Sequence, residues 1–333
     1  MKSGSKKKII NIVCAIISAA LLFMLFTHYY DVQVNKIGIF ARPKIYKAFM
    51  MILSLFLGWT LSVAISEFKQ AMKFVKISFE NRKLIKTLSK KDFKNKFASS
   101  YLGIIWGFIH PLVTIIVYWF VFQVAFEQEG IGQIPYIVWF ICGIIPWFFF
   151  SESFPSTSNV FLEYSYLVKK VVFKIEVLPA VKIISALFVH VFFILFIYII
   201  TALYGITPDI YTLQFLYYSC AMIILVYSLC IFTSAVVLFF RDLGQIISVI
   251  LSVGFWFTPI GWKLTQIPEW ARIIFKLNPL YYIVTGYRDA FVSKVFFWER
   301  PYLTAYFWLV CFTILCLGVK MFNKLKPHFS DVI

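Results

Sequence analysis

Lysine ammonium groups that could bind anions are clustered in the stretch 89–101, SKKDFKNKFASSY, directly before an apolar run. Ser89 and Asp92 have the spacing of a capping box, in which a serine accepts a backbone N–H and an acidic side chain three residues later reaches back to the cap. The spacing therefore predicts that a helix begins at Ser89.

The same stretch carries an apolar stripe. Phe93, Phe97 and Tyr101 recur every fourth residue, which places them on one face of a helix, with lysines on the other faces. Lysine side chains at a membrane surface bury their methylene stems and keep the charge in water. The pattern predicts an amphipathic helix in the membrane interface, with a solvated run of charges beside a span as the alternative. Its basic residues are Lys90, Lys91 and Lys94.

Motifs for catalysis are absent from the sequence. There is no G-x-x-x-x-G-K-[ST], H-E-x-x-H or G-x-S-x-G, so neither nucleotide hydrolysis by a P-loop nor these hydrolase chemistries are expected. His110 and His190 each stand alone in an apolar run, where packing or an interhelical hydrogen bond is the expected role. We expect this chain to bind no cofactor or metal and to depend on a partner for mechanical work.

The composition is that of an integral membrane protein, because 61% of the residues are hydrophobic and 14% are charged. The formal charge of +17 comes from lysines and arginines that lie between apolar runs, which predicts topology signals and lipid contacts and argues against a nucleic-acid partner. All six cysteines lie inside apolar segments, where we interpret them as small apolar residues.

Eight apolar stretches are long enough, or nearly so, to cross a bilayer as helices. Basic residues favour the cytoplasmic side of a span, and their distribution predicts that both termini are cytoplasmic. The fold class expected is therefore an all-α polytopic membrane protein, with two spans preceding a core of six. The stretches are 9–27, 46–66, 103–126, 135–157, 180–204, 213–239, 244–264 and 302–322.

A polar stretch after the second span divides the chain. We predict a two-span N-terminal extension, a basic linker with the interfacial helix, a six-span core and a cytoplasmic tail. Neither half of the chain mirrors the other, which argues against an inverted-repeat transporter. The predicted boundaries are 1–68, 69–102, 103–326 and 327–333.

Two further segments are neither spans nor ordinary loops. Residues 158–179 are too charged for a span and too apolar for a free loop, which predicts a short helix whose exposed Phe161, Leu162, Tyr164 and Leu167 contact a cytoplasmic protein.

On the opposite side, Pro268 and Pro279 interrupt the apolar periodicity of 262–291. Because proline disfavours helix at the preceding residue, two short helices that dip partly into the outer leaflet are expected there.

Six stretches occur in a characteristic order: KDFKNKFASSYLGIIWGFIHPL (91–112), PWFFF (146–150), NVFLEYSYLVKKVVF (159–173), FFRDLGQI (239–246), FWFTPIGW (255–262) and LNPLYYIVTGYRDAF (277–291). This ordered set resembles ABC-2 type permeases that export polysaccharides, the family of teichoic acid, O-antigen and capsule exporters. The resemblance covers about residues 80–330. It implies a homodimer of six-span subunits in a bacterial plasma membrane, working with two copies of a separate ATPase that binds ATP and Mg²⁺.

The resemblance also implies roles for individual residues. Residues 89–101 resemble a gate helix at the cytoplasmic entrance, and 163–172 resemble a coupling helix that docks on the ATPase. Lys174 departs from the family, which commonly has proline there. The residues implied for coupling are Glu163, Tyr164, Leu167, Lys169 and Lys170, those for the gate helix are Lys90, Lys91, Phe93, Lys94, Phe97 and Tyr101, and those for an outer gate are Asn278, Pro279, Tyr281 and Tyr282.

Aromatic residues in the first two core spans are candidates for a channel wall. Sugar faces stack on aromatic rings, and many weak contacts hold a sliding polymer without trapping it. Interface belts and plain helix packing are the alternative for each ring. The candidates are Trp106, Tyr118, Trp119, Trp139, Trp147, Phe148, Phe149 and Phe150.

The leading hypothesis is a permease subunit of an ATP-driven exporter of a lipid-linked cell-envelope polysaccharide, with teichoic acid as the first expectation for the polymer. The gate-helix lysines, with Lys96, would attract an anionic pyrophosphate headgroup, or equally ordinary anionic lipids. The alternatives are an ABC-2 permease for small hydrophobic molecules and a membrane enzyme acting on lipid-linked sugars. The enzyme would need convergent acidic residues, whereas Glu152, Glu163 and Glu176 are scattered in sequence.

Overall fold

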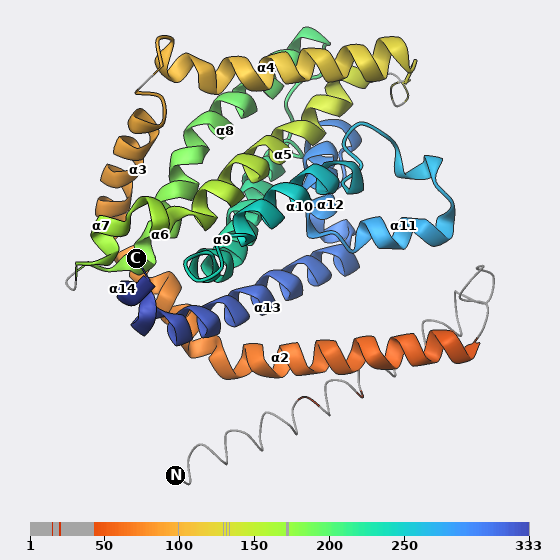
Figure 1. Cartoon of the computed structure of the whole chain (residues 1–333). Coiled ribbons are helices and arrows are strands. Elements are labelled where there is room, and N and C mark those ends of the chain that lie inside the picture. Colours follow the sequence, from red (N-terminus) through yellow and green to blue (C-terminus); the bar gives the residue numbers. More distant parts are fainter. Residues whose placement is uncertain are drawn as a thin grey trace.

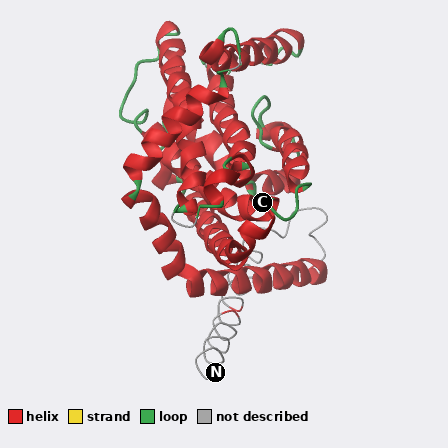
Figure 2. Cartoon of the chain, turned by 60° about the vertical axis from the view of Figure 1, so that its left-hand side comes forward, coloured by secondary structure: helices red, strands yellow, loops and turns green. Residues whose placement is uncertain are grey.

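The computed structural model describes residues 43–332 except 99, 129, 131, 133, 171 and 172, together with Ala15 and Ala20. Its described residues form helices joined by loops and contain no strand (Figure 2). This confirms the all-α fold class. The predicted span 9–27 lies outside the described residues apart from those two alanines.

The basic stretch before the core is helical. Helix α2 spans Pro43–Glu80 and α3 spans Arg82–Lys96, so α2 contains both the apolar stretch 46–66 and the start of the predicted linker. The buried side chains of Ala71 and Phe74 pack against α13 and α9, which explains why the helix continues past the apolar stretch. The expected boundary at residue 68 lies inside α2, and the division into domains stays a prediction.

Five helices in the described part of the chain are long and apolar enough to span a membrane, and they match five predicted core spans. They are Gly103–Ala125, Tyr136–Ser158, Ile175–Leu203, Gln214–Val237 and Pro301–Val332. Their elements are η2 (Gly103–Ile105), α4 (Trp106–Trp119), η3 (Phe120–Ala125), α5 (Tyr136–Ser158), η4 (Ile175–Val177), α8 (Leu178–Leu203), α9 (Gln214–Val237), α13 (Pro301–Leu325), η8 (Lys326–His328) and α14 (Phe329–Val332).

The remaining core helix is shorter than predicted. Helix α10 spans Leu243–Phe257, and Thr258 already has an extended backbone, so the expectation of a span over 244–264 is wrong at its C-terminal end. Pro259 explains the early stop, because the residue before a proline is pushed out of the helical region. The apolar residues that follow the break belong to a turn.

Helix α5 is the centre of the bundle. Most of its residues are buried, and it packs against α8, α9, α10 and α12. Helix α4 lies at one edge with almost none of its residues buried, and α2 lies along α13 at the opposite edge (Figure 1). The apolar core therefore forms around α5, with one side covered by α2 and α13.

Short elements gather at the two ends of the bundle (Figure 1). At one end α3 crosses the ends of the long helices, beside α6 (Val160–Glu163), α7 (Ser165–Val168), η8 (Lys326–His328) and α14 (Phe329–Val332). At the other end lie η5 (Leu264–Gln266), α11 (Glu269–Lys276), α12 (Pro279–Arg288), η6 (Asp289–Ser293) and η7 (Phe297–Glu299).

The C-terminal residues are packed against the bundle. Phe329 is buried, with its ring centroid 5.4 Å from that of Phe161 and 5.5 Å from that of Phe322. Lys326 forms an ion pair with Glu176. The segment expected to be a tail therefore supports the base of α6 and the end of α13.

Candidate functional site

The cap predicted at Ser89 is wrong, because α3 begins about two turns earlier, at Arg82. Ser89 lies inside the helix, where its hydroxyl donates to the Ile85 carbonyl at 2.8 Å and to the Val181 carbonyl of α8 at 2.9 Å. Asp92 is buried, and its carboxylate interacts with side chains outside α3. Here a serine and an aspartate three residues apart hold α3 against α8, and they do not cap the start of a helix.

The predicted apolar stripe is correct over its first two residues. The rings of Phe93 and Phe97 lie 5.7 Å apart, and Phe93 also packs on Phe188 of α8 at 5.2 Å. Tyr101 lies beyond the end of α3 and is fully exposed. The buried face of α3 thus points at α8, and the helix lies across the end of the bundle (Figure 1).

The lysines predicted for the gate helix lie away from this packed face. Lys90, Lys91 and Lys94 are exposed. Their ammonium groups are thus accessible to anionic headgroups at a membrane surface.

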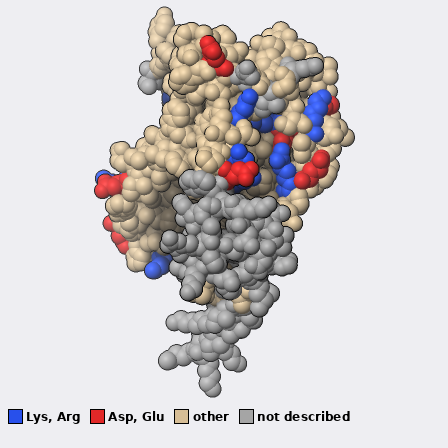
Figure 3. All heavy atoms as spheres, turned by 90° about the vertical axis from the view of Figure 1, so that its right-hand side faces the viewer, with Lys and Arg blue, Asp and Glu red and all other residues tan. Residues whose placement is uncertain are grey.

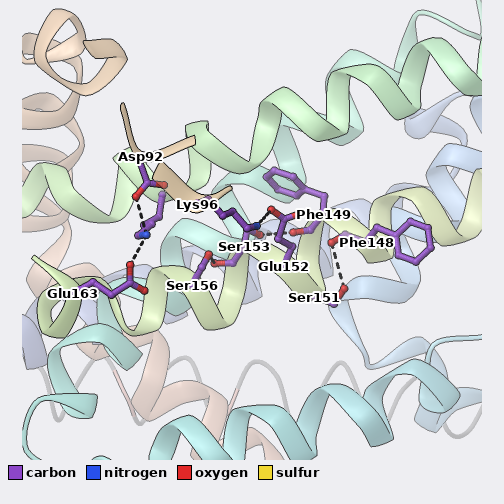
Figure 4. A network of polar contacts seen from close by, with 10 residues as sticks. Asp92, Lys96, Phe148, Phe149, Ser151, Glu152, Ser153, Ser156 and Glu163 are labelled. Carbon is purple, nitrogen blue, oxygen red and sulfur yellow. Dashed lines mark hydrogen bonds and ion pairs between the residues drawn. The ribbon is translucent and has the colours of Figure 1, made fainter. Parts of the chain in front are cut away.

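A polar cavity of about 410 Å³ lies between α3, α5, α6 and α8. Lys96 forms an ion pair with Glu152 across it. On its other side, Asp92 and Glu163 both point at one ammonium group, that of Lys182 on α8 (Figure 4). Two lysines and three carboxylates leave the charged lining at −1, so the cavity itself does not favour an anion.

The predicted coupling helix 163–172 is two short helices, and it ends earlier than expected. Helix α6 ends at Glu163, Tyr164 lies between the helices, and α7 ends at Val168. Lys169 and Lys170 follow as exposed residues. Residues 171 and 172 are among those that the structure does not describe.

The apolar patch expected on this segment is not exposed. Phe161 is completely buried. Leu162, Tyr164 and Leu167 are half-buried against the cluster that contains it. These side chains fill the inner side of the segment because Phe322 and Phe329 lie directly beneath them. The outward surface consists of Glu163, Tyr166, Lys169 and Lys170, of which Tyr166 was not singled out from the sequence.

The aromatic candidates divide by burial. Trp139, Trp147, Phe149 and Phe150 lie inside the core around α5, so in this arrangement their rings contact protein. Three other candidates are half-buried, namely Tyr118, Trp119 and Phe148. Trp106 is exposed at the start of α4. Tyr118 stacks on Phe255 of α10 with ring centroids 5.2 Å apart.

At the opposite end, the breaks predicted from two prolines are confirmed. Helix α11 begins directly after Pro268, and α12 begins at Pro279. Asn278 is the N-cap of α12: its side-chain oxygen accepts the Leu280 N–H at 3.0 Å, and its amide donates to Thr258 at 2.8 Å. The cap thus ties the start of α12 to the turn after α10.

The two tyrosines predicted for the outer gate differ in burial. Tyr281 is half-buried, whereas Tyr282 is buried, with its hydroxyl 2.9 Å from that of Tyr217 and 3.0 Å from that of Thr304.

Arg288, which the sequence did not single out, holds this end together. Its buried guanidinium donates to the carbonyls of Pro259 at 2.7 Å and Ile260 at 2.6 Å, and lies 3.4 Å above the Trp139 ring. It approaches α5 where residue 143 is glycine, since a Cβ there would be 2.5 Å from the guanidinium. An arginine in the apolar context YIVTGYRDAF was the available signal.

Groups that could carry metal or redox chemistry are few. The described residues contain no cluster of His, Cys, Asp and Glu suited to a metal ion. His190 bonds the Tyr287 hydroxyl of α12 at 2.9 Å, which confirms the expected interhelical hydrogen bond. Cys142, Cys220, Cys230, Cys311 and Cys316 are free thiols.

Seen from the end that carries α11, the surface is mostly uncharged, with acidic and basic side chains both present (Figure 3). No single sign of charge dominates the visible described residues there.

Comparison with known proteins gives a consistent result. Residues 83–292 match the family described as "ABC-2 type transporter". An O-antigen export system permease protein RfbA of Klebsiella pneumoniae is 29% identical over 252 residues, which cover 75% of this chain and 95% of that protein. One from Myxococcus xanthus is 27% identical over 264 residues, covering 79% of this chain and 100% of that protein.

Proposed function

Because the chain belongs to the ABC-2 type transporter family, we propose that it is the permease subunit of an exporter of a lipid-linked cell-envelope polysaccharide in a bacterial inner membrane. The relatives' names point to O-antigen-like polymers. The observation that carries the proposal is the arrangement around α5. This central helix runs from the end that contains the broken α11 and α12 to the end where it leads into α6 and α7.

Energy for transport comes, in this proposal, from two copies of an ATPase that bind the exposed surface of α6 and α7, with ATP and Mg²⁺ on that partner. Glu163, Tyr166, Lys169 and Lys170 form this surface at the tip of the segment. The half-buried and buried aromatic and leucine side chains beneath would transmit movement into the bundle, because close-packed interiors resist compression.

A second copy of the chain would complete the transport path. The apolar outer faces of α4 and α10 are exposed, whereas α2 covers α13 on the other side of the bundle. We therefore place the second subunit against α4 and α10, with the exposed aromatic residues near the shared path. A mass of one 38.9-kDa chain per particle in mild detergent, in the presence of the ATPase, would contradict this assembly.

Depletion of the protein tests the export function. The polymer should accumulate on its lipid carrier inside the cell while the amount at the surface falls. Normal surface polymer after depletion, in a strain without a second exporter, is the result that refutes the proposal.

The coupling surface is tested by charge reversal. Lys169→Glu combined with Lys170→Glu should weaken ATPase binding by roughly tenfold, which corresponds to about 1.4 kcal/mol. Lys320→Glu combined with Lys324→Glu is the matched control, since both residues are exposed on α13. Co-purification with the ATPase and substrate-stimulated ATP hydrolysis measure the effect, and equal behaviour of the two double variants would remove α6 and α7 from the coupling role.

A further inference from the structure

Three elements that are separate in sequence meet at the ammonium group of Lys182. The Nζ atom of this α8 residue lies 2.8 Å from Asp92 Oδ1 of α3 and 2.5 Å from Glu163 Oε2 of α6 (Figure 4). The Tyr164 hydroxyl donates to the same Asp92 oxygen at 2.7 Å, and the ammonium group lies 5.5 Å from the Tyr164 ring centroid. The predicted gate helix and the predicted coupling segment are thus joined through one side chain.

The contact is largely shielded from water. The side chains of Lys182 and Asp92 are 11% and 9% exposed, whereas that of Glu163 is 47% exposed. Burial, and secondarily the hydrogen bond to Asp92, raises the pKa of the Tyr164 phenol, so this residue remains a donor at physiological pH. A shielded charge cluster holds its partners at defined positions, even where its net contribution to stability is small.

The geometry also indicates which part of the cluster can move relative to the rest. Helices α6 and α7 have four residues each, so their position depends on what they contact. Glu163 is the half-exposed member at the surface segment, and Asp92 is the buried member on α3. A displacement of the segment changes the distance from Glu163 and Tyr164 to the shared lysine and aspartate. The interaction energy of charges falls as that distance grows, and it is larger in a partly buried site than in bulk water.

We propose that Lys182 is a positioning residue that couples movement of the α6–α7 segment to α3, so that the position of the ATPase-contacting segment sets the position of the entrance helix. The inference rests on the proposed function, in which those two elements are the coupling segment and the gate. The cavity beside the cluster is bounded by the same residues, so movement of α3 relative to α6 changes its opening.

The sequence around Lys182 is consistent with this role. It is a lone lysine near the start of an apolar helix, VLPAVKIISALFV, where a charge is costly unless it has partners. Its neighbour Val181 supplies the carbonyl that Ser89 of α3 bonds at 2.9 Å. The same turn of α8 therefore holds α3 through a backbone contact that remains when the Lys182 charge is removed.

The test uses the full permease–ATPase complex in lipid vesicles, with a synthetic polyprenyl-pyrophosphate-linked oligosaccharide as substrate. Lys182→Met keeps the methylene stem and removes the charge, and Lys182→Arg keeps both charge and reach. We expect Lys182→Met to lower the ratio of substrate-stimulated to basal ATP hydrolysis, and transport, by roughly tenfold. The KM for ATP should stay unchanged, and Lys182→Arg should restore most of the ratio.

Lys326→Met is the matched control, because it removes an ion pair with Glu176 at the same end of the bundle without touching α3. A purely structural role would lower the yield or the melting temperature of Lys182→Met and leave the hydrolysis ratio per assembled complex intact. If Lys182→Met does not assemble with the ATPase, the same ratio is measured in Asp92→Asn, because this variant removes the charge on the α3 side.

A ratio within twofold of the wild type in Lys182→Met, or in Asp92→Asn where that variant decides, overturns the inference. Failure of the proposed function looks different, because the wild-type complex itself would then show no substrate-stimulated hydrolysis.

Discussion

Replacing Arg288 with lysine tests how the broken end of the bundle is held. Lysine keeps the charge, but it lacks the planar fork that donates to the carbonyls of Pro259 and Ile260 at 2.7 and 2.6 Å. An ammonium group at this position can satisfy one of the two acceptors well. The loss is therefore about one charge-assisted hydrogen bond, with one buried carbonyl left without its partner.

The size of the effect follows from these contacts. A hydrogen bond to a charged group contributes about 1.5–3 kcal/mol, and a weaker interaction with the Trp139 ring adds about 0.5 kcal/mol. A loss of about 2–3.5 kcal/mol lowers the melting temperature by roughly 3–5 °C, because the unfolding entropy grows with chain length and this chain has 333 residues. Thermal unfolding of the purified protein in detergent measures the shift.

The control is the same substitution at a more exposed arginine. Arg272 also donates to two backbone carbonyls, those of Ile267 at 3.1 Å and Thr265 at 3.2 Å, but its side chain is 31% exposed. Water replaces lost hydrogen bonds there, so Arg272→Lys should change stability by about 0.5 kcal/mol or less. Melting temperatures for Arg288→Lys and Arg272→Lys within 2 °C of each other would refute the role assigned to the buried fork.

Two further predictions concern packing. Gly286→Ala places a methyl group against the ring of Tyr218 and should destabilise the protein by about 1–3 kcal/mol. In the control Gly254→Ala the methyl group makes only an ordinary contact, so this variant should be neutral or stabilising. Thermal unfolding compares the two variants, and equal melting temperatures would contradict the close approach at Gly286. Phe329→Ala empties the space beside Phe161 and should lower the free energy of unfolding by about 3–5 kcal/mol. It should also weaken ATPase binding, which co-purification detects. Full binding at normal stability would show that this contact is dispensable.

Features set by local chemistry were predictable from the sequence. The starts of α11 and α12 follow from Pro268 and Pro279, because a proline restricts the residue before it wherever it occurs. Five spans follow from apolar length alone. The same rule applied to Pro259 would have ended α10 at Phe257, so the error in that span came from giving hydropathy more weight than a local signal.

Features set by distant partners were not predictable. Ser89 and Asp92 have the spacing of a cap, and only the position of Val181 and Lys182, some ninety residues away, decides that they hold α3 against α8. In the same way, the fully buried Phe161 looked exposed because nothing local indicates that the C-terminal segment folds back over it. The role of a polar or aromatic residue depends strongly on such distant contacts, whereas the formation of a helix depends on them much less.

The distribution of polar contacts also bears on how a force applied at one end of this chain reaches the other. Ion pairs involving Lys96 and Lys182 lie at the end that carries α3 and α6, and the guanidinium contacts of Arg288 lie at the end that carries α12. Between them α5 is surrounded by buried apolar side chains. Helix α5 therefore connects the two ends through continuous close-packed contacts, and its residue Trp139 lies against Arg288, which bonds the carbonyls of the turn after α10.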